Sequence, residues 1–412
     1  MMNIKSIPVN LQLLLCIMIA CVAEATAQNR SSDFKSGVTY TLQLDVVSEG
    51  FDGETCWFHP RAGAIPGPTP TVVMTLQKWL FSRSDVFLPL QSMWTADLGK
   101  NWTEPIDPHQ ALGRRTEPDG TVIGICDFSP KWHAATGKLL GTGHTVRYQD
   151  NHLIKGRPRS TAYAVYDAEK KVWSAWATLK MPDEPMFYSE GAGSTQRIDL
   201  PNGDILIPSY FKGEEDAVYK SAVLRCRFDG KTLRYVEHGT ALSLPTGRGL
   251  YEPSLTAFQG KYYLTLRNDA LGYVAVSEDG LHFDTPKVWH FDDGEVVPTY
   301  NTQQHWVTHS DGLFLVYTRK GANNDNVARH RAPLFIAQVD PVRLVILRDT
   351  EQVLVPNKGA QLGNFGVTNV NENETWVTTS EGMSKNGSKY GANGRVYAAR
   401  IIWSTPNKAW KQ

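Results

Sequence analysis

Polar side chains occupy strand positions where a packed core would carry aliphatic residues. Arginine and histidine predominate among them, and these residue types, like tyrosine and glutamate, transfer protons or bind anionic groups. The set comprises His59, Arg61, His133, His144, Gln196, Tyr210, Arg225, Arg248, Tyr251, Glu252, Arg267, Asn301, Gln303, His305, Arg319, His330 and Arg331. In a ring of β-sheets such positions line the central axis, so we expect these residues to form one ligand site there.

Four of these residues, His133, Tyr210, Arg225 and His144, suit proton abstraction beside a carboxylate. The C5 proton of a uronic acid is hard to remove because the neighbouring carboxylate resists further negative charge. An arginine can neutralise that carboxylate, while tyrosine or histidine accepts the proton and protonates the departing oxygen. We therefore predict these four as catalytic residues of a β-elimination. The alternatives are a structural hydrogen bond for His133 and a structural salt bridge for Arg225.

A second group of residues is predicted to bind the substrate. It comprises His59, Arg61, Trp132, Arg248, Tyr251, Glu252, Arg267, Gln303, His305, Arg319, His330 and Arg331. Hydrolysis stays open as another chemistry. A glycosidase, for example an α-L-rhamnosidase, would use two carboxylates, with Glu252 and either Asp127 or Asp269 as candidates. A sialidase-like exo-enzyme would instead use several of the arginines, and a glycan-binding propeller without catalysis would need none of these roles.

Other cofactors and partners find little support in the sequence. It contains no GxSxG, HExxH, phosphate-binding glycine loop or EF-hand loop. The 42 basic and 42 acidic residues cancel, which argues against nucleic acid as a partner. One metal hypothesis concerns His305 and His309, four residues apart, which with His133 could hold a structural divalent cation in the axial channel.

The elements that must position these residues are repeated hairpins. Each has a short strand, a turn and a second strand richer in apolar residues. They span Pro130–Tyr148, Thr195–Tyr210, Pro253–Asn268, Gln303–Thr318, Gly363–Thr379 and, in a looser form, Glu54–Gln77. Their spacing of about 50–60 residues is in the range of propeller blades. The long interval before Pro130, with a further strand predicted at Thr121–Cys126, leaves room for another blade.

Two turns match the Asp-box, Ser/Thr-x-Asp-x-Gly-x-x-Trp, of sialidase-like propellers. Thr95–Trp102 fits it fully and Ser277–Phe283 is a shortened relative. The alternating segments Val38–Val47 and Arg395–Trp403 are expected to pair and close the ring, since closure removes a free sheet edge. We predict an all-β, seven-bladed, sialidase-like β-propeller, with six blades as the alternative, and a single domain over residues 28–412.

The first residues are predicted to direct export. Met1–Ala27 has a basic start, an apolar run and a small-x-small cleavage site, as in a signal peptide. Lipoprotein processing at Cys21 is the alternative, and no transmembrane segment is expected. The mature chain keeps Cys56, Cys126 and Cys226, which could form one disulfide or remain three thiols. The protein is therefore expected in the periplasm, at the cell surface or outside the cell.

Five longer runs resemble one enzyme family. They are CWFHPRAGAIPG (Cys56–Gly67), PKWHAATGKLLGTGHT (Pro130–Thr145), GRGLYEPSLT (Gly247–Thr256), YNTQQHWVTHSDGLFLVYTRKGANND (Tyr300–Asp325) and RHRAPLFIAQVDP (Arg329–Pro341). The runs are similar to secreted bacterial propeller enzymes that cleave the L-rhamnose-α-1,4-D-glucuronate caps of arabinogalactan. These are the family 42 polysaccharide lyases, formerly glycoside hydrolase family 145, and they are related to propeller ulvan lyases. The resemblance implies seven blades and a lyase acting on a uronate-bearing glycan.

The resemblance also implies roles for individual residues. Tyr210 and Arg225 match the tyrosine and arginine of the ulvan-type arrangement, and His133 matches its first histidine. The second histidine has two matches, at positions 144 and 152. Some relatives are argued to work from the opposite face through a single histidine near the N-terminus, which His59 matches. We rank the His133 face first, because the polar residues of several blades are expected to converge there.

Overall fold

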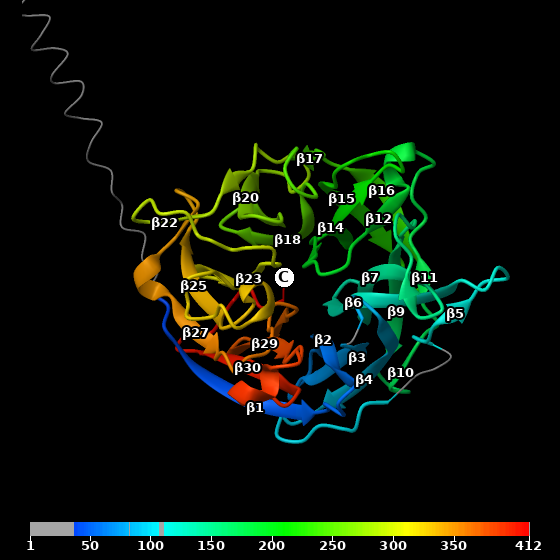
Figure 1. Cartoon of the computed structure of the whole chain (residues 1–412). Coiled ribbons are helices and arrows are strands. Elements are labelled where there is room, and N and C mark those ends of the chain that lie inside the picture. The colour runs from blue at the N-terminus through cyan, green and yellow to red at the C-terminus, as the bar shows by residue number, and fades with distance from the viewer. Residues whose placement is uncertain (1–36, 82, 107–110, 412) are drawn as a thin grey trace, which may run out of the picture. The chain divides into compact units, whose positions relative to one another are not determined.

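The computed structural model describes residues 37–81, 83–106 and 111–411. The predicted signal peptide lies outside these residues. Gly37–Gln412 form one compact unit, in which the strands make six sheets around a common centre (Figure 1). Within the described part of the chain no helix is long and apolar enough to cross a membrane.

The six sheets follow one another along the chain. The first sheet contains β2 (Thr55–Ile65), β3 (Thr71–Leu80) and β4 (Phe87–Thr95). The second contains β5 (Arg115–Thr116), β6 (Val122–His133), β7 (Lys138–Gln149), β8 (His152–Leu153), β9 (Thr161–Asp167), β10 (Val172–Trp173) and β11 (Ala177–Thr178). The third contains β12 (Ser189–Gly191), β13 (Ile198–Asp199), β14 (Asp204–Lys212), β15 (Lys220–Phe228), β16 (Leu233–His238) and β17 (Leu242–Ser243).

The remaining sheets complete the ring. The fourth contains β18 (Tyr251–Phe258), β19 (Lys261–Arg267), β20 (Gly272–Ser277) and β21 (Lys287–Val288). The fifth contains β22 (His290–Phe291), β23 (His305–His309), β24 (Gly312–Tyr317), β25 (Leu334–Asp340), β26 (Val345–Ile346) and β27 (Gln352–Val355). The sixth contains β28 (Gly366–Asn371), β29 (Glu374–Ser380), β30 (Arg395–Trp403) and β1 (Tyr40–Glu49). Short 3₁₀ helices are η1 (Pro185–Phe187), η2 (Ala328–His330), η3 (Arg348–Thr350) and η4 (Gly387–Tyr390).

Ring closure follows the predicted pairing. β1 pairs antiparallel with β30, from Tyr40 opposite Trp403 to Glu49 opposite Arg395. The N-terminal strand thus completes the sheet built by the last three strands of the chain, which covers an edge that would otherwise stay free. The sheets then meet through strands near the axis, since β2 contacts both β6 and β28, and β18 contacts β14 and β23.

The predicted number of seven blades is wrong. Each of the six predicted hairpins belongs to a different sheet. Five of these sheets have four or more strands, as a full blade does, whereas the first has three, so six complete blades are not formed either. The strand expected at Thr121–Cys126 is the first half of β6, which a bulge after Cys126 divides. Because the bulge interrupts the alternation of the sequence, one long strand was predicted as two separate strands.

The Asp-box turns are confirmed. Asp97 Oδ1 accepts a hydrogen bond from the Asn101 amide at 2.9 Å, and Gly99 takes the positive φ of 80°. The second turn repeats the device, with Asp279 Oδ1 accepting from the amides of Leu281 and His282 at 2.8 Å each. A carboxylate that accepts several backbone amides fixes a tight turn. These turns support the fold and supply no chemistry.

The hydrophobic core lies between neighbouring sheets. Val73 of the first sheet packs with Phe128 and Leu139 of the second, and Leu140 of the second packs with Ile207 of the third. All three cysteines of the described chain, Cys56, Cys126 and Cys226, are buried free thiols. Burying apolar faces between sheets leaves the inner edges to carry polar residues toward the axis.

Candidate functional site

A repeated backbone bulge organises the polar residues at the axis. Among the non-glycine residues with positive φ, five with values between 46° and 57° lie within or just before the inner strands of five different sheets: His59, Asp127, Ser194, Glu252 and Asn301. This left-handed conformation is costly for residues with a Cβ and is typical of functional sites. At His59, Asp127 and Glu252 it coincides with a register shift in β2, β6 and β18 that breaks the strand alternation, whereas Ser194 and Asn301 precede β13 and β23 on the same part of the axis. We call this part of the axis the bulge end.

At the bulge end, residues of the first and third sheets contact the carboxylate of Asp127 in the second. Asp127 Oδ1 accepts hydrogen bonds from Arg61 Nη2 at 2.9 Å and from Ser194 Oγ. His59 Nε2 lies 3.2 Å from the same oxygen. Burial lowers the pKa of His59 to about 4, with Asp127 opposing the shift. Burial also opposes ionisation of Asp127, but the charges of His59 and Arg61 outweigh it and keep the pKa of that carboxyl below its usual range.

The fourth and fifth sheets contribute a cluster of arginine and tyrosine. Tyr251 Oη donates to Asp269 Oδ1 at 2.7 Å and accepts from Arg248 Nη2 at 2.6 Å. Arg267 donates to Glu252 at 2.5 Å and to Asn301 Oδ1 at 2.6 Å. The guanidiniums of Arg248 and Arg267 lie 4.6 and 4.8 Å from the centre of the Tyr251 ring. Both arginines are therefore held in place by carboxylates and by one aromatic ring.

Arg331 differs from its two neighbours because no carboxylate pairs with it in the described chain. Its Nη2 donates to the Asn301 carbonyl at 2.8 Å, and its buried Nε has no partner among the described residues. Burial, together with the nearby charge of Arg267, lowers the pKa of Arg331 to about 9. A buried guanidinium without a counter-charge favours binding of an anion.

Tyr210 connects this cluster to the second sheet. Arg159 Nη1 donates to Tyr210 Oη at 2.8 Å, and the Arg159 guanidinium lies 4.3 Å from the centre of the same ring. The ring centres of Tyr210 and Tyr251 are 6.3 Å apart, and those of Tyr210 and His144 are 6.1 Å apart. Burial raises the pKa of Tyr210, while Arg159 opposes the shift. A tyrosine beside an arginine is thus present, with Arg159 where Arg225 was expected.

Further along the axis lies a cavity of about 330 Å³, which we call the cavity end. Four cationic side chains are among its lining residues, and no carboxylate is: Arg61, Lys131, Arg197 and Lys411. Trp132 and Trp306 add aromatic surface. His305 also lines the cavity, and its Nδ1 bonds Ser254 Oγ at 2.6 Å while its buried Nε2 has no partner in the described chain.

His133 does not face the axis, contrary to expectation. Its ring nitrogens contact Thr136 Oγ1 at 2.8 Å and the Gly203 carbonyl at 3.0 Å. The ring packs against Phe228 of β15, and the side chain is fully buried. His133 is the last residue of β6, where the chain turns into β7, so it joins two turns instead of lining the site. The structural alternative considered for His133 is the one that its contacts support.

Arg225 is also remote from Tyr210. It lies on β15 opposite Leu206, four residues from Tyr210 along β14. Its side chain pairs with Asp204 at 2.6 Å and with Glu237 at 3.1 Å. These bonds raise the pKa of Arg225. Arg225 therefore has the structural role considered as the alternative. From β15 its side chain forms salt bridges with two carboxylates of the same sheet, Asp204 on β14 and Glu237 on β16.

The other predicted residues divide between these surroundings. Gln303 joins the bulge end, where its Oε1 accepts from Arg61 Nη2 at 3.4 Å. Arg319 forms an ion pair with Glu351 at 2.5 Å, and His330 lies 3.5 Å from Asp325. Neither the contact of Arg319 nor that of His330 involves the residues of the bulge end. The structure therefore brings together most of the predicted binding residues; of the predicted catalytic four, Tyr210 and His144 stay together, while His133 and Arg225 lie elsewhere.

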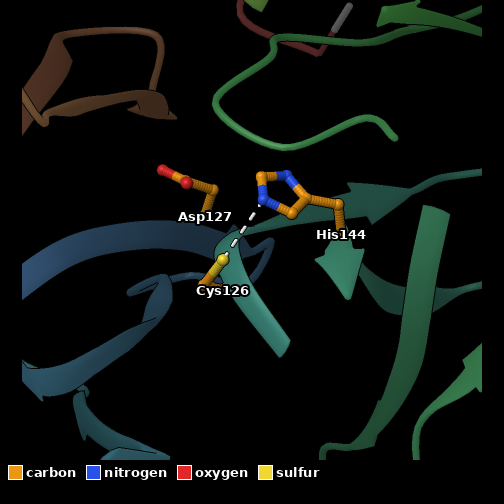
Figure 2. Close-up of side chains that lie close together, drawn as sticks. All are labelled: Cys126, Asp127 and His144. Carbon is orange, nitrogen blue, oxygen red and sulfur yellow. Dashed lines mark hydrogen bonds between the residues drawn. The ribbon is translucent and has the colours of Figure 1, made fainter. Parts of the chain in front are cut away.

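The predicted histidine metal site is not formed. His305 lies at the cavity end, whereas His309 Nε2 donates to the Thr405 carbonyl at 3.0 Å and His133 contacts the turns described above. In the described part of the chain, the one group of three or more possible ligands is Cys126, Asp127 and His144 (Figure 2). Their ligand atoms lie within 4.8 Å of one another.

Sequence reasoning missed Arg159 and Ser194, and it considered Asp127 and Asp269 only as weak glycosidase candidates. The sequence does contain a pattern at the five positions of the bulge end. It is a polar-x-polar triplet at the start of five hairpins: His59-Pro60-Arg61, Asp127-Phe128-Ser129, Ser194-Thr195-Gln196, Glu252-Pro253-Ser254 and Asn301-Thr302-Gln303. The first residue of each triplet has the positive φ, and strand alternation alone gives no reason to expect it.

Comparison with known proteins identifies the fold. No family model matches the chain, and no curated protein sequence matches it. A protein of unknown function from Dyadobacter fermentans shares 15% identity with a TM-score of 0.59, covering 89% of this chain and 99% of that chain. Trypanosoma rangeli sialidase shares 14% identity with a TM-score of 0.59, covering 89% of this chain and 60% of that chain.

A third solved structure agrees with these two. The NanB sialidase of Streptococcus pneumoniae shares 9% identity with a TM-score of 0.57, covering 87% of this chain and 70% of that chain. At such identities the likeness concerns the fold alone. The chain has an all-β propeller fold of the sialidase type, and its chemistry must be argued from its own residues.

Proposed function

We propose that the bulge end binds the carboxylate of a uronate-bearing glycan and that the protein cleaves this glycan by β-elimination. The observation that carries the proposal is Arg331, a buried guanidinium without a carboxylate partner in the described chain. The guanidiniums of Arg267 and Arg248 both lie over the adjoining Tyr251 ring. Arginines bind carboxylates strongly, and neutralising the carboxylate makes the C5 proton of a uronate easier to remove.

The proton-transfer group that suits this arrangement is Tyr210. Its hydroxyl accepts a hydrogen bond from Arg159 Nη1, whose charge favours the phenolate; the phenolate would take the C5 proton, and the phenol so formed would give that proton to the C4 oxygen. In glucuronate the C5 proton and the C4 oxygen lie on one face, so one residue can remove the first and protonate the second. The family resemblance names the substrate as the L-rhamnose-α-1,4-D-glucuronate cap of arabinogalactan.

An exo-glycosidase is the second candidate, and one observation favours it. Arg248, Arg267 and Arg331 gather near Tyr251 and Glu252, which are the residue types expected of a sialidase-like enzyme. Elimination produces an unsaturated uronate that absorbs ultraviolet light, whereas hydrolysis releases a reducing sugar without this absorbance. A protein that only binds the glycan gives neither signal, and calorimetry still detects the complex.

The test of the proposal replaces the unpaired arginine. Arg331→Met should lower turnover of gum arabic by roughly 10²–10³-fold, measured by the absorbance of the unsaturated product. The variant should also be at least as resistant to denaturant as the parent, because it removes a buried charge without a partner. Arg225→Met, which removes ion pairs within the third sheet, is the matched control and should keep its activity. Full activity of Arg331→Met would remove the proposed carboxylate site.

A further inference from the structure

Three metal-ligating residue types meet beside the bulge end. Cys126 on β6 pairs in register with His144 on β7, and Asp127 follows Cys126 directly. Successive residues of a regular strand point to opposite faces. The positive φ of 52° at Asp127 breaks this alternation, so that thiol, carboxylate and imidazole come within 4.8 Å of one another. Figure 2 shows a ring nitrogen of His144 directed at Cys126.

The partners of the Asp127 carboxylate all contact one of its two oxygens. The hydrogen bonds of Arg61 and Ser194 and the contact of His59 all reach Asp127 Oδ1. Among the described residues no hydrogen bond reaches Oδ2. This division resembles that of many metal ligands, in which one atom binds the metal while partners hold the rest of the group in place.

The imidazole of His144 lies beside the thiol of Cys126. His144 Nε2 lies 3.3 Å from Cys126 Sγ, and the buried Nδ1 has no hydrogen-bond partner among the described residues. The ring occupies space that two glycines leave open, since a Cβ on Gly193 would stand 1.8 Å from His144 Nδ1 and one on Gly191 would stand 2.6 Å from the His144 Cβ.

We propose that Cys126 Sγ, Asp127 Oδ2 and His144 Nε2 bind one zinc ion. Thiolate, imidazole and carboxylate are the ligands that Zn²⁺ takes, and three protein ligands leave the fourth tetrahedral position open. On binding, the S–H bond breaks, its proton goes to solvent, and the thiolate electron pair forms the S–Zn bond. The resulting group of thiolate, carboxylate, imidazole and Zn²⁺ is neutral, which suits a place near the cations Arg61 and Arg159.

This site goes beyond the proposed cleavage of a glycan and does not rest on it. Its ligands are distinct from the arginines that would bind a carboxylate. The His144 ring adjoins Tyr210 edge to face, so a bound ion would fix the side chain next to the proposed proton-transfer group. Metal binding can be measured without any substrate, and either proposal can fail while the other stands.

Cobalt is the probe, because a thiolate–Co²⁺ bond gives an ultraviolet charge-transfer band. The full chain is stripped with a chelator, titrated with Co²⁺ in weakly buffered solution, and then titrated with Zn²⁺ as competitor. We expect one Co²⁺ per chain, a thiolate band that Zn²⁺ abolishes, and one proton released per ion. Absence of binding, or binding without the thiolate band, would overturn the proposal.

Variants locate the site. Cys126→Ser should abolish the thiolate band, and Asp127→Asn should keep the band but weaken binding by roughly 10–100-fold. Cys226→Ser is the matched control, since Cys226 is equally buried and lies outside the cluster. Cys226→Ser should behave as the parent. A band that survives in Cys126→Ser, or disappears in Cys226→Ser, would place the metal elsewhere. Asp127→Asn provides the test on its own if Cys126→Ser does not fold.

Discussion

The bulge end and the cavity end are built by the same inner strands, yet they differ in charge and packing. On β2 the bulge places His59 and Arg61 among polar partners, whereas Ala62 and Ala64, further along, line the cavity of about 330 Å³. β18 repeats the pattern, with Glu252 at the bulge and small or apolar residues beyond it. The bulge end is filled by charged side chains that hydrogen-bond to one another, whereas the cavity end encloses empty space.

The difference lies in the backbone. A left-handed residue in each of five sheets directs a polar group toward the axis, and these groups satisfy one another across sheets. Where the strands resume regular alternation, small side chains face inward and leave space. Strained residues persist when the surrounding structure fixes them, and they gather at functional sites. We therefore place the chemistry at the bulge end and expect the cavity end to be dispensable for turnover.

The largest expected effect concerns the buried ion pair of the bulge end. Arg267→Met leaves Glu252 without its cation, and both side chains are largely buried. Removing one partner of such a pair should cost about 3–5 kcal/mol in the free energy of unfolding. Turnover should fall as well. Urea unfolding and the absorbance assay measure the two effects.

The control removes both charges. Arg267→Met with Glu252→Gln should recover most of the lost stability, because no unpaired buried charge remains. Activity should stay low, since the carboxylate would still lack this guanidinium. A double variant as unstable as the single one would show that packing, and not charge, causes the loss.

A smaller effect is expected at His133, the residue ranked first from the sequence. His133→Ala removes the contacts to Thr136 and to the Gly203 carbonyl. This should lower the free energy of unfolding by about 1–3 kcal/mol, because a buried acceptor is left without a donor. Turnover of the folded protein should be unchanged. If the folded variant were inactive, the working site would have to move away from the bulge end.

At the cavity end the expected effect is a pH dependence. Burial lowers the pKa of Lys131 to about 8, with Asp199 opposing the shift, whereas an unfolded lysine has a pKa of about 10.4. Between these values the unfolded chain keeps a proton that the folded chain has released, so Lys131 contributes stability that rises with pH in this window. Lys131→Met should remove this rise, measured as the difference between the urea midpoints of the two proteins.

The same variant probes the comparison of the two ends. Lys131→Met should turn over substrate at the rate of the parent, because the cavity end is not expected to take part in cleavage. A substantial loss of turnover would assign a working role to the cavity. A pH dependence identical to that of the parent would mean that Lys131 is solvated.

The smallest effect is expected at Arg225. Arg225→Ala removes ion pairs with Asp204 and Glu237, and its side chain is 31% exposed. The pair with Glu237 is partly exposed, and Asp204, although only 10% exposed, keeps Arg227 at 3.4 Å, so stability should fall by about 1 kcal/mol and turnover should not change. Loss of turnover without unfolding would restore Arg225 as a catalytic residue and would contradict the placement of the site around Arg267.

The sequence by itself determined the local elements. The six hairpins, the two Asp-box turns and the pairing of the first with the last strand all follow from alternation, turn residues and the need to cover a sheet edge. These features depend on residues close together in the chain or on one pairing. The likeness to sialidases in fold agrees with them.

Only the tertiary structure decided the number of sheets and the partners at the axis. Alternation tells which side of a strand a residue faces, but it does not tell how far along the axis the residue lies or whether a bulge has reversed it. His133 and Arg225 were therefore expected beside Tyr210, whereas turns and outer strands hold them. Arg159 and Asp127 reach the site because positive φ and contacts between sheets bring distant segments together, and these depend on the closed ring as a whole.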